Sequence, residues 1–298
     1  MSVLILGGAG YIGSHMVAYL QQQNLDCVVI DNLSTGFRES VPVNVPFYEG
    51  DLADKSLLAD ILNKHGVSAV MHFAAFSQVG ESVVEPQKYY QNNLLNTLSV
   101  LQVMQEYGVE QFVFSSTAAV YGQPQSELID EQHPTNPINP YGRSKLAVEW
   151  VLQDYAEAYG LKSVCLRYFN AAGAQPDAGN GERHDPETHL VPLVLQAASG
   201  RRGSISVFGD DYATADGTCV RDYIHIVDLA QAHLLALNWL QKQSGGIYKV
   251  FNLGNGNGYS VSKIIDAVTA VTGNEFRVIH AERRTGDPDV LVASADLA

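Results

Sequence analysis

A tyrosine and a lysine four residues apart, Tyr141 and Lys145, are the pair of side chains best suited to chemistry in this sequence. At that spacing both lie on one face of a helix. A neighbouring ammonium favours the phenolate and lowers the pKa of a tyrosine, as an oxidised nicotinamide would. Hydroxyl side chains end an earlier predicted strand at Ser115, Ser116 and Thr117. By itself the pair is equally typical of an exposed helix, but hydroxyls, a tyrosine base and a lysine around a nicotinamide would form an alcohol-oxidation site.

A glycine-rich turn near the N-terminus is suited to a dinucleotide. Gly7, Gly10 and Gly13 follow a predicted strand and open a predicted helix. Glycines permit a tight turn and the close approach of a pyrophosphate, and the helix N-terminus supplies amide donors. Asp31 ends the second predicted strand, where a carboxylate accepts hydrogen bonds from ribose hydroxyls and repels a 2′-phosphate. The pattern predicts NAD rather than NADP; the alternative is a glycine turn without a ligand.

Two further strand ends carry residues that fit a cofactor. Asp51 and Leu52 follow the third predicted strand, where the carboxylate would reach an adenine amino group or cap a helix. Phe73, Ala74 and Ala75 follow the fourth. Small residues there suit a close cofactor and equally suit plain packing.

Short apolar runs alternate with helical segments through the first 170 residues. Strands are predicted over residues 3–6, 26–30, 46–49, 68–72, 111–115 and 162–167. Helices are predicted over residues 11–23, 55–64, 87–107 and 141–159. Strands that alternate with crossover helices predict an α/β fold, a Rossmann-type doubly wound parallel sheet with a smaller C-terminal α/β substrate lobe.

The pattern changes after Asn170, which suggests a domain boundary. Residues 171–188 are rich in Gly, Pro, Asn and charge, as a loop would be. We expect residues 1–170 to form an NAD-binding Rossmann domain to which residues 224–252 return. Residues 171–223 and 253–298 would form the lobe that binds the substrate.

Composition excludes several classes of function. Eighteen basic and 32 acidic residues give a net charge of −14, which disfavours nucleic acid and anionic membranes as partners. Three scattered cysteines favour a reducing compartment over a disulfide framework or a zinc site. The histidines, including His184 and His189, show no metal-ligand spacing, so no metal is expected. With no secretion signal and no apolar run of membrane-spanning length, the predicted location is cytoplasmic.

The sequence resembles the extended short-chain dehydrogenase/reductases, and most closely the UDP-glucose 4-epimerase (UDP-galactose 4-epimerase) family. The resemblance extends from the glycine turn to near the C-terminus. The stretches that carry it are residues 7–13, 72–75, 79–82, 115–122, 140–145, 167–170, 216–225 and 283–287. The Gly-Thr-x-x-Arg-Asp-Tyr-Ile-His run from Gly217 and the Arg-Arg-x-Gly-Asp run from Arg283 point most narrowly to the epimerases.

The resemblance implies a role for each site residue. Tyr141 would be the catalytic base, Lys145 would tune it and hold the nicotinamide ribose, and Thr117 would bind the sugar 4-hydroxyl. The cofactor contacts expected from the motifs and the resemblance are Gly7, Gly10, Tyr11, Ile12, Gly13, Asp31, Asn32, Asp51, Leu52, Phe73, Ala74, Ala75, Asn92, Ser115, Tyr141, Lys145 and Tyr168. The expected substrate contacts are Ser116, Thr117, Tyr141, Asn170, Leu190, Phe208, Arg221, Arg284 and Asp287.

Among these substrate contacts, the resemblance implies a division of labour around a UDP-sugar. Asn170, Arg221 and Arg284 match positions that hold the diphosphate, and an arginine fork suits a phosphate. Without the resemblance, each arginine would equally well pair with a neighbouring acid. Leu190 and Phe208 would form the uracil pocket, and the contact to the uridine ribose would come from the acid that ends the Arg-Arg-x-Gly-Asp run.

The activity implied is the NAD-dependent interconversion of UDP-galactose and UDP-glucose, by C4 oxidation, rotation of the 4-keto intermediate and re-reduction. A 4,6-dehydratase is disfavoured because alanines, not carboxylates, follow Thr117. UDP-N-acetylhexosamine and UDP-pentose epimerases stay open, with Leu291 at the position that gates the N-acetyl group by size. A catalytically inactive NAD-binding regulator of the same fold is a further alternative.

The resemblance also bears on assembly and on the C-terminus. Family members are commonly homodimers through a helical face of the main domain, and the helices predicted over residues 87–107 and 141–159 are candidates here. Members usually continue through further C-terminal helical structure, whereas this sequence ends at Ala298. If that structure supports the lobe, the short form is expected to lose stability or substrate affinity.

Overall fold

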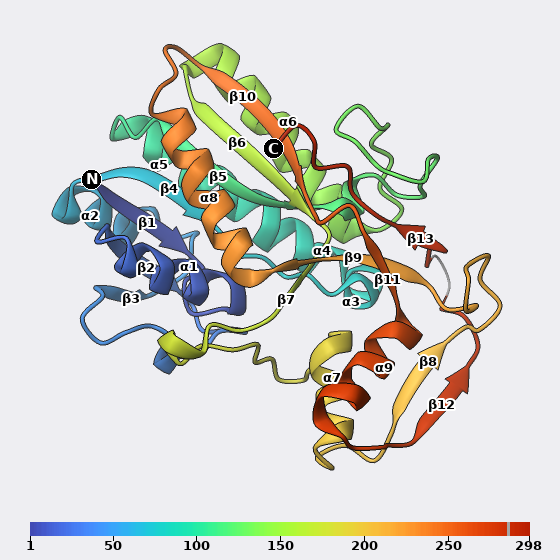
Figure 1. The fold of residues 1–298 in the computed structure, drawn as a ribbon. Coiled ribbons are helices and arrows are strands. Elements are labelled where there is room, and N and C mark those ends of the chain that lie inside the picture. Colours follow the sequence, from blue (N-terminus) through green and yellow to red (C-terminus); the bar gives the residue numbers. More distant parts are fainter. Residues whose placement is uncertain (285–286) are drawn as a thin grey trace.

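A seven-stranded parallel sheet forms the centre of the larger part of the molecule (Figure 1). The computed structural model describes residues 1–284 and 287–298. The strand order is β10-β6-β5-β4-β1-β2-β3. The strands are β1 (Ser2–Leu6), β2 (Asp26–Asp31), β3 (Phe47–Glu49), β4 (Val67–His72), β5 (Gln111–Thr117), β6 (Lys162–Tyr168) and β10 (Ile247–Leu253). The order reverses at β1 and β4, as in a doubly wound fold, so the predicted fold class is confirmed.

Helices cover both faces of the sheet because successive side chains of each strand point to opposite sides. Val3 and Ile5 of β1 pack in one core with α1 (Tyr11–Gln22) and α8 (Ile226–Leu240). Leu4 and Leu6 pack in the other core. That second core is covered by α2 (Lys55–His65), α5 (Asn96–Glu106) and α6 (Pro140–Tyr159). Figure 1 shows α1 and α8 on the near side of the sheet.

Capping residues define where the helices begin and end. Asp54 accepts a hydrogen bond from the amide of Leu57 at the start of α2, as the sequence predicts. Asn139 does the same for the amide of Gly142 at the start of α6, 2.9 Å away. Gly160 ends α6 in the left-handed conformation, which glycine adopts without strain. These caps fix the register of the helix that carries Tyr141.

The long helix predicted over residues 87–107 is interrupted. It consists of α4 (Pro86–Tyr89), a π-helical segment η2 (Tyr90–Leu95) and α5. Asn93 in the π-helical segment is buried and binds the backbone of Phe76 through both amide atoms, each at 3.0 Å. Such wide turns often occur at functional sites. The periodicity predicted the helix but not this widening.

The remaining elements form smaller sheets and helices beyond the carboxyl ends of the central strands (Figure 1). Strand β9 (Val220–His225) pairs with β7 (Asn170–Ala172), β11 (Gly258–Ser260) and β13 (Val290–Leu291), and β8 (Ile205–Phe208) pairs with β12 (Val278–Ala281). The helices are α3 (Val79–Val84), α7 (Leu190–Ala198) and α9 (Val261–Thr272), with short turns η1 (Arg38–Ser40), η3 (Ala118–Val120) and η4 (Pro176–Ala178). Two of the segments expected to return to the main domain, α8 and β10, lie in its helical layer and its sheet.

Two neighbouring residues of helix α6 differ sharply in exposure. Glu149 is fully buried and forms an ion pair with Arg167. Trp150 is 59% exposed. Helical periodicity places neighbours on different faces but does not say which face meets the sheet. Here the sheet covers the glutamate and leaves the tryptophan to solvent.

All three cysteines are free and buried. In the described ranges, 1–284 and 287–298, no helix is both long and apolar enough to cross a bilayer.

Candidate active site

A single cavity of about 590 Å³ opens where the carboxyl ends of the parallel strands meet. Its walls are the turn after β1, the ends of β2, β4, β5 and β6, the start of α6 and a loop that follows β7. Ligands of doubly wound sheets bind at this edge, where the strand order reverses.

The glycine turn lets the backbone approach a ligand closely. Gly7 has a φ of +76°, and a Cβ there would lie 2.6 Å from the amide nitrogen of Ala74. A Cβ on Gly13 would overlap the carbonyl of Gly7. Helix α1 begins beside them with Gly10 as a cap that offers no side-chain hydrogen bond, so its first amides are open to an anion. All three glycines line the cavity, together with Tyr11 and Ile12.

The acid at the end of β2 is held rigidly at the cavity wall. Asp31 accepts hydrogen bonds from the amides of Ala9, at 2.9 Å, and Leu33, at 2.8 Å. Burial raises the pKa of this carboxyl group, although both amide hydrogen bonds oppose the change. A carboxylate fixed at this point fits a ribose diol. The glycine turn and Asp31 together therefore fit a dinucleotide.

The carboxylate after β3 is already well satisfied by protein groups. Asp51 accepts hydrogen bonds from the side chains of Asn32 and Asn96, each at 3.0 Å, and from the amide of Ala53, at 2.9 Å. It lines the cavity with Asn32 and Leu52. This position serves at least to fix the loop after β3 at the cavity wall.

Tyr141 and Thr117 meet at the inner end of the cavity. Both line it, and Tyr141 is only 9% exposed. Burial raises the pKa of Tyr141, while a hydrogen bond with Thr117 lowers it in part. Burial thus acts on this pKa in the opposite direction to the lowering that the sequence predicts from an ammonium and an oxidised nicotinamide. The physical reason is that removal from water disfavours the phenolate more than its neighbours favour it.

Lys145 lies one helical turn further along α6 and also lines the cavity. Its Nζ donates a hydrogen bond to the carbonyl oxygen of Ser115 at 2.7 Å and lies 4.6 Å from the ring centre of Phe114. Burial lowers the pKa of Lys145 to about 7, against smaller raising contributions from Cys165 and Glu149. The lysine is thus poised between its charged and neutral forms near neutral pH.

The two serines of β5 do not line the cavity, in contrast to the prediction. Ser115 Oγ lies 2.9 Å from Nε2 of His233 and also hydrogen-bonds to Tyr168. Ser116 is fully buried and donates to Glu149 on the opposite face of the sheet. The alternation of side chains along a strand explains why neighbouring hydroxyls separate in this way. The prediction that Ser116 lines the pocket is therefore wrong, and its hydroxyl instead hydrogen-bonds to Glu149.

Most other predicted contacts also reach the cavity. They are Phe73, Ala74, Ala75, Asn92, Tyr168, Asn170 and Arg221. Asn170 donates to the backbone carbonyl of Asp222 at 3.0 Å, so β7 and β9 are joined beside the cavity. Tyr168 is buried enough that its pKa lies well above the ordinary value.

Besides Ser116, four predicted substrate contacts lie outside the cavity wall. Phe208, Arg284 and Asp287 form a group of their own, in which Arg284 pairs with Asp287 at 2.8 Å and lies 5.2 Å from the ring centre of Phe208. Arg221 links this group to the cavity through Asp287, 3.7 Å away. Leu190 begins α7 and packs against the core of the small lobe. Residues 285 and 286 of the Arg-Arg-x-Gly-Asp run lie outside the described residues.

Comparison with known families decides the relationship of this chain. The family described as "NAD dependent epimerase/dehydratase family" matches residues 3–254, which include the glycine turn, Asp31, Thr117, Tyr141 and Lys145. The chain belongs to the NAD dependent epimerase/dehydratase family. Within that family, relatives that match the whole length of this chain are named UDP-glucose 4-epimerase.

Individual epimerases match at high identity. A UDP-glucose 4-epimerase from Halalkalibacterium halodurans is 51% identical over 300 residues, covering 100% of this chain and 88% of the relative. A UDP-glucose 4-epimerase from Streptococcus mutans is also 51% identical, with 100% and 90% covered. The fold agrees with that of solved epimerases. The UDP-glucose 4-epimerase of Brucella ovis in complex with NAD has a TM-score of 0.96 at 48% identity, with 100% of this chain and 90% of that chain covered.

The cavity of this epimerase/dehydratase chain also contains residues that the sequence analysis did not select. Glu81, Lys88 and Tyr89 form one group, in which Glu81 accepts from Lys88 at 2.6 Å and from Tyr89 at 2.8 Å. The ring of Tyr89 lies 6.4 Å from that of Tyr141. Glu81 stands within the run over residues 79–82 that carried the resemblance, so it was visible in the sequence. A second unpredicted group comes from the loop after β7.

Proposed function

We propose that this chain interconverts UDP-galactose and UDP-glucose, as an NAD-dependent isomerase that inverts the configuration at C4. One observation carries the proposal: a single cavity joins the glycine turn and Asp31 at one end to Thr117, Tyr141 and Lys145 at the other. The first set fits a dinucleotide and the second fits the oxidation of a hydroxyl group. The epimerase relatives, matched along the whole chain, support the same activity.

NAD would lie along the cavity, with its pyrophosphate at the N-terminus of α1 and a ribose at Asp31. When bound, NAD would supply the group that accepts the C4 hydrogen of the sugar and gives it back. Gly7 and Gly13 leave room for that approach, since a Cβ at either position would meet backbone atoms. Phe73, Ala74 and Ala75 would contribute the wall beside the nicotinamide end.

Tyr141 would take the proton of the sugar 4-hydroxyl, with Thr117 orienting that hydroxyl. Since burial raises the pKa of Tyr141, the phenolate needs a positive neighbour to form. Lys145, one turn away on α6, supplies that charge in its protonated form. The proton returns to the 4-oxygen when the sugar is reduced on its other face, so the tyrosine acts as base and then as acid.

The diphosphate of the substrate would be held by Asn170, Arg221 and Arg284. Arg221 lines the cavity, and Asp287 forms ion pairs with both Arg221 and Arg284. Phe208 of that group would pack on the uracil, with Leu190 nearby in the lobe and Asp287 at the uridine ribose. Anchoring the nucleotide leaves the sugar free to turn, as inversion requires.

The test is a coupled assay that follows UDP-glucose formed from UDP-galactose by the purified protein without added NAD. Tyr141→Phe is expected to lose activity by about 10²- to 10⁴-fold, because the base is removed while the ring stays. Tyr159→Phe is the matched control, since this tyrosine lies on the same helix and is 56% exposed. Absence of product from the unmodified chain, with or without added NAD, would exclude the proposed reaction.

A wider substrate range is the second candidate, because Leu291 lines the cavity. The resemblance places at this position the residue whose size gates an N-acetyl group. A solved UDP-Glc/GlcNAc 4-epimerase from Campylobacter jejuni is 43% identical, with a TM-score of 0.85. The same assay with UDP-N-acetylglucosamine and a UDP-pentose decides between the ranges. Turnover of none of these sugars, with NAD still bound, would leave an inactive regulator.

We also propose a cytoplasmic homodimer. Three buried free cysteines suit a reducing compartment. Trp150 on α6 and Leu95, which precedes α5, are 59% and 47% exposed, and apolar residues of this size are typical of an interface. Sedimentation of the purified chain and of Trp150→Glu tests the dimer. If the unmodified chain and Trp150→Glu both sediment as monomers, the proposed dimer is contradicted.

A further inference from the structure

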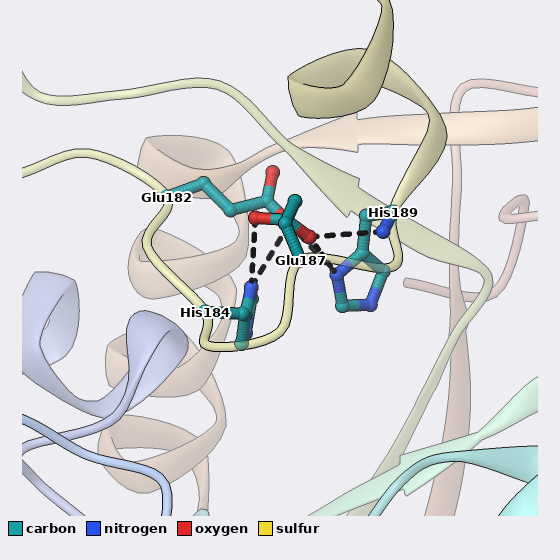
Figure 2. Close-up of side chains that lie close together, drawn as sticks. All are labelled: Glu182, His184, Glu187 and His189. Carbon is teal, nitrogen blue, oxygen red and sulfur yellow. Dashed lines mark hydrogen bonds and ion pairs between the residues drawn. The ribbon is translucent and has the colours of Figure 1, made fainter. Parts of the chain in front are cut away.

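Two histidines and two glutamates converge in the loop between η4 and α7, at the wall of the cavity. They are Glu182, His184, Glu187 and His189, and one ligand atom of each lies within 4.8 Å of the others. Figure 2 shows the four side chains facing one another from one stretch of chain. Neither the proposed base nor the dinucleotide contacts use them. Neither histidine shows metal-ligand spacing in the sequence, which therefore predicts no metal.

The distances between these groups suit a small cation. Nδ1 of His189 lies 3.1 Å from Oε1 of Glu182 and 3.2 Å from Oε1 of Glu187. Nδ1 of His184 lies 3.3 Å from Oε2 of Glu187 and 3.7 Å from Oε1 of Glu182. A tetrahedral zinc ion with nitrogen and oxygen ligands at about 2.0–2.1 Å separates its ligand atoms by roughly 3.3 Å. Four of the separations, at 3.1–3.7 Å, are near this value, and small side-chain shifts would bring all four donors, which lie within 4.8 Å of one another, around such an ion.

Among the described residues, the two buried carboxylates have no lysine or arginine as an ion-pair partner. The side chains of Glu182 and Glu187 are only 7% and 6% exposed. In the part of the chain that the structure describes, their ion-pair partners are these two histidines alone. Burying two carboxylates together is unfavourable unless a cation compensates them. Neutral imidazoles would leave the group with a charge of −2.

One oxygen of the group has no hydrogen-bond partner. Oε1 of Glu182 is buried and accepts no hydrogen bond from any described residue, although both histidine Nδ1 atoms lie near it. The corresponding oxygen of Glu187 accepts from the amides of Thr188, at 2.8 Å, and His189, at 2.9 Å. Those amides orient Glu187 in the way that outer hydrogen bonds orient metal ligands. The unpartnered atom points to a missing ligand rather than to a completed network.

We propose that Glu182, His184, Glu187 and His189 bind one divalent transition-metal ion of the zinc class. Imidazole and carboxylate are ligands that zinc accepts in four-coordinate sites. The ion cancels the charge of the two carboxylates and ties residues 182–189 into one rigid turn. That turn lies against Tyr11, whose ring is 5.9 Å from the ring of His184 and whose hydroxyl donates to the carbonyl of Gly173. The ion therefore stabilises this wall of the cavity.

The first experiment measures zinc binding by the whole purified chain after a chelator has removed bound metal. Competition with a fluorescent zinc indicator is expected to give one zinc ion per chain. Glu182→Gln and His184→Asn are each expected to weaken that binding by at least about tenfold, because outer-sphere changes alone often have that effect. Loss of zinc affinity in both variants would support the site.

Matched controls separate this cluster from adventitious binding. Asp177→Asn removes a carboxylate from the same loop, and His280→Asn removes a histidine that lies 3.6 Å from Asp210. Both should retain the zinc affinity of the unmodified chain. Zinc that binds the two cluster variants as tightly as the controls, or no stoichiometric zinc on the unmodified chain, would overturn the proposal.

Two readouts distinguish a metal ligand from a residue that only helps the loop to fold. Cobalt in place of zinc should give the strong visible absorption of a four-coordinate ion in the unmodified chain and lose it in Glu182→Gln. Zinc should raise the melting temperature of the unmodified chain but not of that variant, since only a ligand bound to the folded state stabilises it. Neither readout uses a substrate, so the outcome is independent of the epimerase assay.

Discussion

The proposed site has an inner end at the central sheet and an outer end, which consists of Arg221 at the cavity wall and the Arg284–Asp287 pair outside that wall. These two ends are built in different ways. At the inner end, Thr117, Tyr141 and Lys145 come from a strand and a capped helix that pack directly on the central sheet. At the outer end, Arg221, Arg284 and Asp287 come from β9 and from the segment before β13, more than sixty residues apart along the chain. The inner groups are buried, whereas the side chain of Arg284 is 60% exposed. The groups proposed for chemistry lie on the central sheet and on the helix packed against it, whereas the groups proposed for substrate binding lie on segments outside that sheet.

Burial changes what charge does at each end. At the inner end, removal from water moves the pKa of Tyr141 up and that of Lys145 down. At the outer end, Arg284 and Asp287 form an exposed pair, which contributes little to stability. We therefore expect substitutions at the inner end to affect rate and stability strongly. Substitutions at the outer end should mainly affect substrate binding.

The largest effect is expected from Lys145→Met. Loss of the ammonium should lower kcat by about 10²- to 10⁴-fold, since the phenolate loses its positive neighbour. The pKa of Lys145 in the folded protein, about 7, lies below the unfolded value, so folding is penalised once the unfolded lysine is protonated. The penalty is complete below pH 7 and disappears as pH rises from about 7 toward 10.4.

That pH dependence is measured as the difference in unfolding free energy between the unmodified chain and Lys145→Met. The difference should move in favour of the unmodified chain across the window from about pH 7 to pH 10. Taking a difference cancels the tyrosines and cysteines that also titrate there. A difference that does not change with pH would mean that Lys145 keeps an ordinary pKa, and the contrast in burial would fail.

The next effect is expected from Glu149→Ala, which leaves Arg167 buried without its partner. Arg167 donates to Glu149 at 3.0 Å and to Tyr121 at 3.0 Å, and it is 5% exposed. Removing one member of such a pair lowers the free energy of unfolding by about 3–5 kcal/mol. Denaturant unfolding measures this loss.

The exposed pair of Glu110 and Lys162 provides the control for that substitution. Glu110→Ala should lower the free energy of unfolding by no more than about 1 kcal/mol, because the Glu110 side chain is 62% exposed. Equal losses in the two variants would contradict the difference drawn here between buried and exposed charge.

The smallest effect is expected from Arg284→Ala. It should raise the KM for UDP-galactose by roughly tenfold, the equivalent of one charge-assisted hydrogen bond, with a smaller change in kcat. Melting temperature should stay the same because the side chain is exposed. Arg202→Ala, an exposed arginine that donates to the carbonyl of Ser204, is the control and should change neither. A fall in kcat at unchanged KM would mean that Arg284 acts in the chemical step rather than in substrate binding.

The site residues at the ends of the central strands were largely predictable from sequence for a geometrical reason. Residues that follow parallel strands gather at one edge, so Gly7, Asp31 and Thr117 had to lie near one another once the strands were assigned. Tyr141 joined them because its helix follows the strand that ends at Thr117. Ser116 was misplaced, since the pattern did not show which face of β5 each hydroxyl occupies.

The outer end was less predictable because no periodicity links its parts. Phe208 and Arg284 meet across β8 and the segment after β12, and Arg221 links this group to the cavity through Asp287. The group of Glu182, His184, Glu187 and His189 was equally hidden, although its members are close in sequence. A loop with neither helical nor strand period gives no direction for its side chains.

By itself, the sequence determined the order of strands and helices, the glycine turn, the acid after β2 and the tyrosine–lysine pair, because these depend on local spacing and on the polarity of neighbours. Only the tertiary structure decided which side chains lost their water. That loss set the direction of the pKa of Tyr141 and Lys145 and buried Glu149 with Arg167. It also brought two glutamates and two histidines to one point. Desolvation depends on everything packed around a group, which no local pattern contains.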